Sequence, residues 1–472
     1  MRQEHSTLCV FLKRYTKFSV LAAAALVLAG SAVWADSSVG TKNDRAARLL
    51  VTVRVPPTTT NTTANALYSF DISWVDQPSR LYFLADRSNK VVDVVDTSAN
   101  ILVEQLAPGP GFAPFAGFTA CVPSTGHGAN DCAGPDGVAT LGQCLFVTDA
   151  PSRVVSFNFM TGATISSVNT DPTDITRADE LAVDPRDSLI LAINNASDPP
   201  FGTFVKFDPK TCVLTPPNPA TDRVTFNTAG GVNATNGAEQ PIWDPVTKKF
   251  YVSIPQIGLA PENGGVIRID AITKTIDNTY GIMFCSPGGL TKGPNNDALV
   301  GCNTVFNTAG GLWTATDPLT AAPIQVILDV VTGAQDQVAG PGASDEVWFN
   351  KGDNNYYTAS STSPLRPLDV VPAPPTPPLT AQGAAILGVI DAKDEEVLQL
   401  VPTFNVPQVP PPPAAPTVHP AGTAHSVAAD AKNNHIFVPL AANNVFPNCL
   451  TGCIAVFWHG DEDEPGENPT PP

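Results

Sequence analysis

The sequence lacks most of the signatures by which enzymes are recognised. It contains no GxSxG nucleophile elbow, no Walker loop, no HExxH motif and no CxxCH haem site, and no two cysteines have CxxC spacing. These absences argue against nucleophile-elbow hydrolysis, nucleotide hydrolysis, zincin chemistry and c-type cytochrome activity. A cysteine-based metal or redox centre is not expected either.

The chain is also poor in basic residues and in long apolar runs. It has 26 Lys and Arg against 44 Asp and Glu, which gives a net charge of −18. A surface this acidic repels phosphate backbones, so nucleic acid is not an expected partner. No apolar run reaches the about 20 residues that a membrane-spanning helix needs, so no membrane anchor is expected.

Residues 1–35 have the features of a secretory signal peptide. A basic segment precedes an apolar run from Phe18 to Leu28, and a small-residue cleavage site ends at Ala35. This order is typical of a leader that is removed on export. We therefore expect cleavage after Ala35, a periplasmic or secreted mature protein, and a short linker over residues 36–46.

The cysteine count fits an oxidising compartment. Nine cysteines less Cys9 of the leader leave eight, an even number, and export permits disulfides. Cys449 and Cys453 are placed to close a small loop, and Cys285 and Cys302 flank a predicted strand-turn-strand unit. The sequence leaves the pairing of four others undetermined: Cys121, Cys132, Cys144 and Cys212.

A short unit recurs seven times along the chain. Each copy runs from small or polar residues through an acidic residue and a short apolar stretch to an aromatic or β-branched strand. The copies begin at Phe70, Pro135, Ala178, Ala238, Pro287, Ser344 and Ala424. Further strand-like stretches that end at turn residues follow each copy. Three or four strands per unit, repeated around a ring, predict an all-β, seven-bladed β-propeller.

The two ends of the repeat region predict how the ring closes. After the seventh unit come only "CIAVFWHG" from Cys453 and an acidic, proline-rich tail, residues 461–472, so the last blade lacks an outer strand. "ARLLVTVRVP" from Ala47 precedes the first unit, and we expect it to supply that strand, which removes two open sheet edges. The propeller would then span residues 47–460. A linear β-solenoid and two separate sandwiches are the alternatives.

Outer strands and long loops complete the predicted blades. We expect outer strands to begin at Ile101, Thr164, Ile324 and Glu396. Residues 105–133 form a Gly/Pro-rich, cysteine-bearing insertion, and two proline tracts lie within and after the sixth unit. Such loops carry recognition on a rigid scaffold or serve as solvated linkers.

The repeats resemble those of exported YVTN-type β-propellers. "LAVDPRDSLILAINN" from Leu181, "IWDPVTKKFYVSI" from Ile242 and "GVIRIDAITKT" from Gly265 carry the likeness. More loosely, the chain is similar to the lactonase, gluconolactonase and streptogramin-lyase-like propellers. The resemblance implies the architecture, and lactone hydrolysis or a lyase step as reactions. A fold shared by enzymes and binding modules does not choose between them.

One position of the repeat is acidic in most units and is a histidine in the last. The inner strand of each blade lines the central channel, so these side chains should meet at one mouth. We call them the ring residues; they are Asp71, Asp136, Asp179, Glu239, Asp345 and His425, while Gly289 stands at the fifth position. A one-residue slip in register would exchange Asp179 and Asp345 for Glu180 and Glu346.

Carboxylates gathered at one mouth repel one another, and a divalent cation would relieve the repulsion. Oxygen ligands favour Ca²⁺ or Mg²⁺, and the imidazole adds Mn²⁺, Fe²⁺ or Zn²⁺. We expect a subset such as His425, Asp71 and Asp345 to share one ion. The structural alternative is that the carboxylates accept hydrogen bonds from backbone N–H groups of the neighbouring blade.

His425 is the ring residue able to act as a general base near neutral pH. His127, with Asp131 nearby, lies in the long insertion and is a weaker candidate, as a lid over the channel. His435 is expected in an exposed turn, and His459 precedes the acidic tail.

The sequence thus predicts an exported propeller that binds a small ligand at the channel mouth, with a divalent cation as a candidate mediator. If it is an enzyme, it is a metal-dependent, lactonase-like hydrolase or a lyase, with His425 moving the proton. The alternative is a non-catalytic binding or cell-envelope scaffold that uses its loops against a protein or polysaccharide partner.

Overall fold

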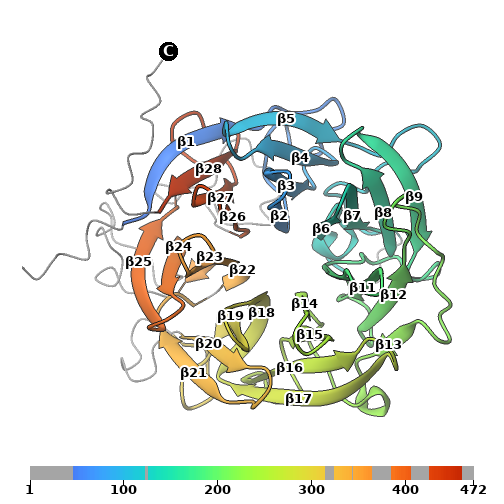
Figure 1. Ribbon diagram of the computed structural model, residues 1–472, viewed down its shortest axis with the longest axis vertical. Coiled ribbons are helices and arrows are strands. Elements are labelled where there is room, and N and C mark those ends of the chain that lie inside the picture. Colours follow the sequence, from blue (N-terminus) through green and yellow to red (C-terminus); the bar gives the residue numbers. More distant parts are fainter. Residues whose placement is uncertain are drawn as a thin grey trace, which may run out of the picture. The chain divides into compact units, whose positions relative to one another are not determined.

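A computed structural model describes residues 46–122, 126–313, 324–342, 344–363, 384–404 and 425–459. Within these residues the strands form seven four-stranded antiparallel sheets that stand as blades around a common centre (Figure 1). The predicted seven-bladed β-propeller is therefore confirmed. The predicted leader, the tail and both proline tracts lie outside the described residues, as does nearly all of the linker.

The first three blades follow one another along the chain without crossovers. Blade 1 comprises β2 (Ser73–Asp76), β3 (Leu81–Asp86), β4 (Val91–Asp96) and β5 (Ile101–Leu106). Blade 2 comprises β6 (Val138–Leu141), β7 (Cys144–Asp149), β8 (Arg153–Asn158) and β9 (Ala163–Asn169). Blade 3 comprises β10 (Leu181–Asp184), β11 (Leu189–Asn194), β12 (Phe201–Lys206) and β13 (Arg223–Thr225).

The next three blades repeat this order. Blade 4 comprises β14 (Pro241–Asp244), β15 (Lys249–Ile254), β16 (Asn263–Asp270) and β17 (Thr275–Met283). Blade 5 comprises β18 (Cys285–Lys292), β19 (Asp297–Val305), β20 (Ile324–Asp329) and β21 (Gln335–Ala339). Blade 6 comprises β22 (Ser344–Asn350), β23 (Asn355–Ser363), β24 (Ala384–Asp391) and β25 (Glu396–Pro402).

Blade 7 is built from both ends of the described chain. Its inner strands are β26 (Ala428–Asp430), β27 (His435–Leu440) and β28 (Cys453–Trp458), and its outer strand is β1 (Arg48–Arg54). β1 pairs antiparallel with β28, from Arg48 opposite Trp458 to Arg54 opposite Cys453. The predicted closure by the N-terminal strand is confirmed, and the first and last blades become neighbours (Figure 1).

Of the four predicted outer strands, three are confirmed and one is wrong. The stretches at Ile101, Thr164 and Glu396 form β5, β9 and β25. The stretch at Ile324 is instead the third strand of its blade, because the polar strand β21 pairs outside it. β20 is apolar and mostly buried, as a third strand should be, whereas β21 is largely exposed.

The core lies between neighbouring blades. The second and third strands bury nearly all their side chains because both faces of each blade are covered. Between blades 1 and 2, for example, Phe83 and Val92 pack with Leu145 and Phe157 in one cluster. Each apolar side chain buried in this way contributes about 1.5–3 kcal/mol, so inter-blade contacts hold the inner strands in place.

Four disulfides connect the eight cysteines of the described residues. The pairs Cys285–Cys302 and Cys449–Cys453 join the residues that the sequence singled out. The other two, which the sequence left open, are Cys121–Cys132 and Cys144–Cys212. Four disulfides in one domain indicate an oxidising, extracellular compartment. Among the described residues, no helix has the length and apolar character needed to cross a membrane.

The disulfides should differ in their contributions to stability. Cys144–Cys212 closes 68 residues and Cys449–Cys453 closes 4. Because the loop-closure entropy removed from the unfolded chain grows with loop length, we expect Cys144→Ser/Cys212→Ser to cost roughly 2.5 kcal/mol more than Cys449→Ser/Cys453→Ser. Urea denaturation of the two double variants measures this difference. Equal losses would contradict the entropic explanation.

Candidate functional site

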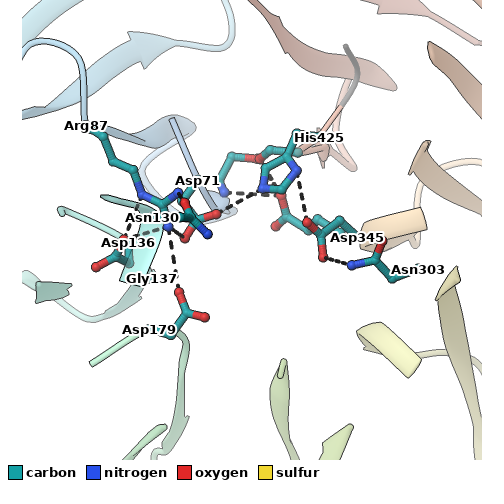
Figure 2. Close-up of polar contacts among 12 residues, drawn as sticks. Asp71, Arg87, Asn130, Asp136, Gly137, Asp179, Asn303, Asp345 and His425 are labelled. Carbon is teal, nitrogen blue, oxygen red and sulfur yellow. Dashed lines mark hydrogen bonds and ion pairs between the residues drawn. The ribbon is translucent and has the colours of Figure 1, made fainter. Parts of the chain in front are cut away.

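Three ring residues meet around a buried arginine at one end of the inner strands. Asp71, Asp136 and Asp179 each lie two residues before the inner strand of blades 1, 2 and 3. Each has a carboxylate oxygen within 4.8 Å of the other two. The guanidinium of Arg87 lies among them (Figure 2): it bonds to Asp71, lies 2.6 Å from Asp136 Oδ1, and lies 3.8 Å from Asp179 Oδ1.

A second arginine and the long insertion extend this cluster. Arg177 donates from Nη2 to Asp179 Oδ2 at 2.8 Å and from Nη1 to the carbonyl oxygen of Asn130 at 2.9 Å. The side-chain oxygen of Asn130 in turn accepts from Arg87 Nη1 at 2.8 Å. Asn130 begins no strand; it belongs to the short helix η2 (Ala129–Cys132) of the insertion. The insertion therefore reaches the channel mouth.

His127, the proposed lid residue, is half-buried, and its Nδ1 lies 3.5 Å from Asp131 Oδ2. In the described part of the insertion it is Asn130, rather than His127, that contacts the arginines of the cluster. A lid role for His127 stays a prediction.

His425 bridges two ring carboxylates. Its Nε2 lies 3.0 Å from Asp71 Oδ1 and its Nδ1 lies 2.9 Å from Asp345 Oδ2 (Figure 2). Asp345 also accepts from Asn303 Nδ2 at 3.1 Å. Burial alone would lower the pKa of His425, but Asp345 and Asp71 raise it to about 10. The imidazole is therefore protonated at neutral pH, with both ring nitrogens available as donors.

The protonated state changes what His425 can do. An imidazolium has no lone pair to accept a proton, so this geometry does not favour the general-base role that the sequence predicts. Its observed contacts are those of a cation that holds blades 1, 6 and 7 together at the channel mouth. A catalytic role for His425 stays a prediction.

The fourth and fifth blades differ from the others at the ring. Glu239 is half-buried and lines a polar pocket that also contains Arg177. Gly289 lies within β18, where the pairing with β19 is irregular, and a β-carbon there would lie 2.4 Å from the carbonyl oxygen of Asp345. By strand pairing Leu290 corresponds to Pro241, so the ring position of the fifth blade is Gly288 and not Gly289, which lies one residue after it. The fifth blade has no side chain at either position.

Acidic groups outnumber the cations at this mouth. The pKa values of most of these acids are therefore raised. Burial raises the pKa of Asp136 well above its ordinary value and raises that of Asp179 to about 7. Burial, with repulsion from Asp179, also raises the pKa of Glu180 and Glu239 well above the usual range. For Asp71 burial is outweighed by Arg87 and His425, which lower its pKa. The mouth therefore retains protons at neutral pH.

Below the mouth, the inner strands of blades 1 to 6 enclose a cavity of about 400 Å³. Three half-buried tryptophans line it, and Trp74 packs edge-on against Trp348 with ring centroids 5.2 Å apart. Trp243 lines it from blade 4. The polar residues of the lining include Glu180, Gln240 and Lys292. A largely apolar chamber with a few polar groups is the usual form of a small-molecule site.

Glu346, the residue after Asp345, has a structural role. Its Oε2 accepts from the backbone N–H groups of Val427 at 2.9 Å and Ser73 at 3.2 Å, and from the hydroxyl of Ser426. One carboxylate thus joins blades 6, 7 and 1. Burial raises the pKa of Glu346 to about 8. This is the neighbour-blade hydrogen bonding expected as the alternative to ligand binding, but one residue beyond the ring.

Close contact between blades 2 and 3 depends on Gly137. Its N–H donates to the carbonyl oxygen of Asp179 at 2.8 Å, and a β-carbon there would lie 2.7 Å from that oxygen. Gly137→Ala should therefore push Asp136 away from Asp179, at a cost of about 1–3 kcal/mol. Thermal and urea unfolding measure the loss. Gly281→Ala is the control, since a β-carbon there meets nothing within 4 Å; equal losses would contradict the close contact.

Sequence reasoning missed the two arginines and the cavity wall. Arg177 was open to detection, because it lies two residues before Asp179 in "ITRADE". Arg87 follows the second strand of its blade and carries no repeat signal. The tryptophans did carry one, since Trp74, Trp243 and Trp348 each come one or two residues before the polar residue that ends an inner strand.

Comparisons with known proteins support the fold alone. No family model matches the chain, and no curated protein matches it. Among solved structures, hydrazine synthase of Kuenenia stuttgartiensis is 11% identical with a TM-score of 0.55, over 87% of this chain and 100% of that one. The Cps50 (Swd1) β-propeller domain of Myceliophteria thermophila is 9% identical with a TM-score of 0.51, over 87% and 99%.

These likenesses fix the architecture but not the activity. In all, 1413 chains of solved structures match, so the fold is too widely used to indicate a function. The chain is a seven-bladed β-propeller with propeller neighbours. The YVTN-type repeat and the likeness to lactonases receive no support from a family match and stay predictions.

Proposed function

We propose that this protein is exported and binds a small ligand in the central channel of its propeller. The observation that carries the proposal is the cavity of about 400 Å³ between the inner strands, with Trp74, Trp243 and Trp348 in its wall. Rigid aromatic side chains around a preformed chamber bind a ligand at little cost in ordering. The four disulfides and the predicted leader support export.

A cavity-filling variant tests the site. Val183 lines the cavity, and Val183→Trp should fill part of it. Val246→Trp is the matched control, because Val246 is 65% exposed. A fragment library is screened by thermal shift: fragments that stabilise the wild type and Val246→Trp should not stabilise Val183→Trp. Equal stabilisation of all three proteins would place binding outside the channel.

A divalent cation at the ring is a second candidate. The observation that favours it is the closeness of three carboxylates, within 4.8 Å of one another. Arg87 already supplies positive charge at that point, so the three carboxylates do not fit an ion while its guanidinium stays in place. Elemental analysis of the wild type and Asp136→Asn tests this: stoichiometric metal lost in the variant would support the cation, and metal-free wild type would exclude it.

The reactions implied by the resemblance, lactone hydrolysis and a lyase step, stay predictions. Binding is the better-supported function, because His425 is held as a cation by two carboxylates and is not free to accept a proton. A protein or polysaccharide partner at the long loops is likewise a prediction.

A further inference from the structure

One carboxylate in the cavity wall has a buried oxygen with no hydrogen-bond partner among the described residues. Glu180 is 5% exposed and lines the cavity, and its buried Oε2 accepts no hydrogen bond. An ionisable group buried without a partner costs free energy. Such a group calls for an explanation, and a ligand that donates to it is one.

The repeat explains why Glu180 differs from its counterparts. Gln240 and Glu346 occupy the same position in blades 4 and 6, directly after the ring residue. Gln240 accepts from the N–H of Leu290 in blade 5 at 2.7 Å, and Glu346 accepts from the N–H of Val427 beside blade 7 at 2.9 Å. In both cases the side-chain oxygen therefore accepts a hydrogen bond from a backbone N–H at the next blade.

For Glu180 the next blade offers no donor. Pro241 pairs with Val252 in blade 4 as Leu290 pairs with Val300 in blade 5, so the proline stands where a neighbouring blade has an N–H. Proline has no amide hydrogen. Glu180 therefore cannot make the hydrogen bond to the next blade that Gln240 and Glu346 make. Its carboxyl group remains available to a ligand in the cavity.

The charges around Glu180 select a cation. Asp179 and Glu239 exert the largest repulsion on Glu180, and both raise its pKa in addition to the effect of burial. The cation of the cavity wall is already engaged, since Lys292 Nζ donates to the carbonyl oxygens of Gly293, Asn295 and Asp297. An anionic ligand would meet repulsion at one end and no available cation at the other.

The aromatic wall favours a cation with an apolar body. Trp74, Trp243 and Trp348 line the same cavity as Glu180. Tryptophan is the side chain that binds organic cations best through its ring face, and apolar groups pack on it equally well. A small hydrated metal ion would leave this wall unused.

We propose that the channel binds an organic ammonium ion, whose N–H groups donate to Glu180 and whose apolar body lies between the tryptophans. The inference rests on the proposed channel function and names its ligand class. Burial and repulsion from neighbouring acids raise the pKa of Glu180. An ammonium ion bound beside this carboxyl group should lower that pKa, so binding should be accompanied by proton release.

Calorimetry with two matched probes tests the inference. 3-Phenylpropylamine and 3-phenylpropan-1-ol share one apolar body and differ in the charge at its end. We expect the amine to bind wild-type protein at least tenfold more tightly than the alcohol. Titrations at pH 7 in buffers of different ionisation enthalpy should show proton release for the amine and none for the alcohol.

Glu180→Gln places in blade 3 the amide that blade 4 carries naturally, so the fold should be retained. We expect this variant to lose the tenfold preference and the proton release while its affinity for the alcohol is unchanged. Equal affinities of the wild type for both probes, with no proton release, would overturn the ammonium inference and leave channel binding intact. If wild-type protein and Val183→Trp respond alike to both probes, the channel is not the site and both proposals fail.

Discussion

Replacement of Arg87 by methionine should destabilise the protein by about 3–5 kcal/mol, the usual cost of breaking a buried ion pair by removing one partner. The side chain of Arg87 is 1% exposed, and it contacts Asp71 and Asp136 while lying 3.8 Å from Asp179. Methionine keeps much of the volume but none of the charge. The carboxylates would be left buried without a counter-ion, and urea denaturation at pH 7 would show the loss.

Two companion variants separate charge from packing. Arg186→Met removes an exposed arginine paired with Asp187, where the expected loss is far smaller than that of Arg87→Met because water screens the pair. Arg87→Met/Asp136→Asn removes a buried charge together with its partner and should recover part of the loss. If Arg87→Met costs no more than Arg186→Met, the guanidinium is not the group that compensates the carboxylates of the ring.

The free energy of unfolding should fall as pH rises from about 5 to about 9. Asp179, Glu346 and His425 have folded-state pKa values raised to about 7, about 8 and about 10. Each therefore binds a proton in the folded state over a range where the unfolded chain has released it. Stability falls with pH wherever the folded state holds more protons.

The size of the pH effect follows from the same groups. Each pKa unit of difference corresponds to about 1.4 kcal/mol, so the three groups together set an upper bound on the order of 10 kcal/mol between pH 5 and 9. The carboxyl groups act between pH of about 4 and 8, and His425 acts between about 6.5 and 10. Asp71 has the opposite effect, because its pKa is lowered in the folded state. Its contribution to stability is complete above about pH 4 and is lost only at lower pH.

Urea denaturation at pH 5, 7 and 9 measures the trend. Glu346→Gln keeps an oxygen that can accept from Ser73 and Val427 but cannot ionise, so the slope between pH 5 and 8 should be shallower in this variant. A maximum of stability near pH 8 in the wild type would contradict protonated, buried acids at the channel mouth.

Much of the fold could be predicted from the sequence because the information is local and repeated. An acidic lead-in, an alternating strand and a turn recur seven times, and the single strand from Ala47 had one vacant edge to fill. The misplaced strand at Ile324 shows the limit of the pattern. Its partner β21 is short and polar, so the alternating apolar pattern that marks strands in the sequence does not reveal this last strand of the sheet.

The candidate site was predictable only in part. The ring position brought Asp71, Asp136, Asp179, Asp345 and His425 to one mouth, as the structure places them. The pattern could not show that an arginine from another part of the chain would lie among these side chains. Arg87 comes from the end of a second strand, and such a contact depends on packing between blades rather than on spacing along the chain.

The role of Glu180 needed the structure for a similar reason. In sequence it is a neighbour of a ring residue and nothing more. Its distinction arises because Pro241, some sixty residues later, removes the N–H that its counterparts bind. A pairwise contact across two blades carries no signal in a single sequence.

The most direct measurement is a crystal structure of the protein soaked with 3-phenylpropylamine. We predict density for the phenyl ring in the cavity between Trp74, Trp243 and Trp348, with the ammonium nitrogen within about 3 Å of the carboxylate of Glu180. A channel that holds only water, with the amine bound elsewhere on the surface or not at all, would contradict the assignment of the channel as the ligand site.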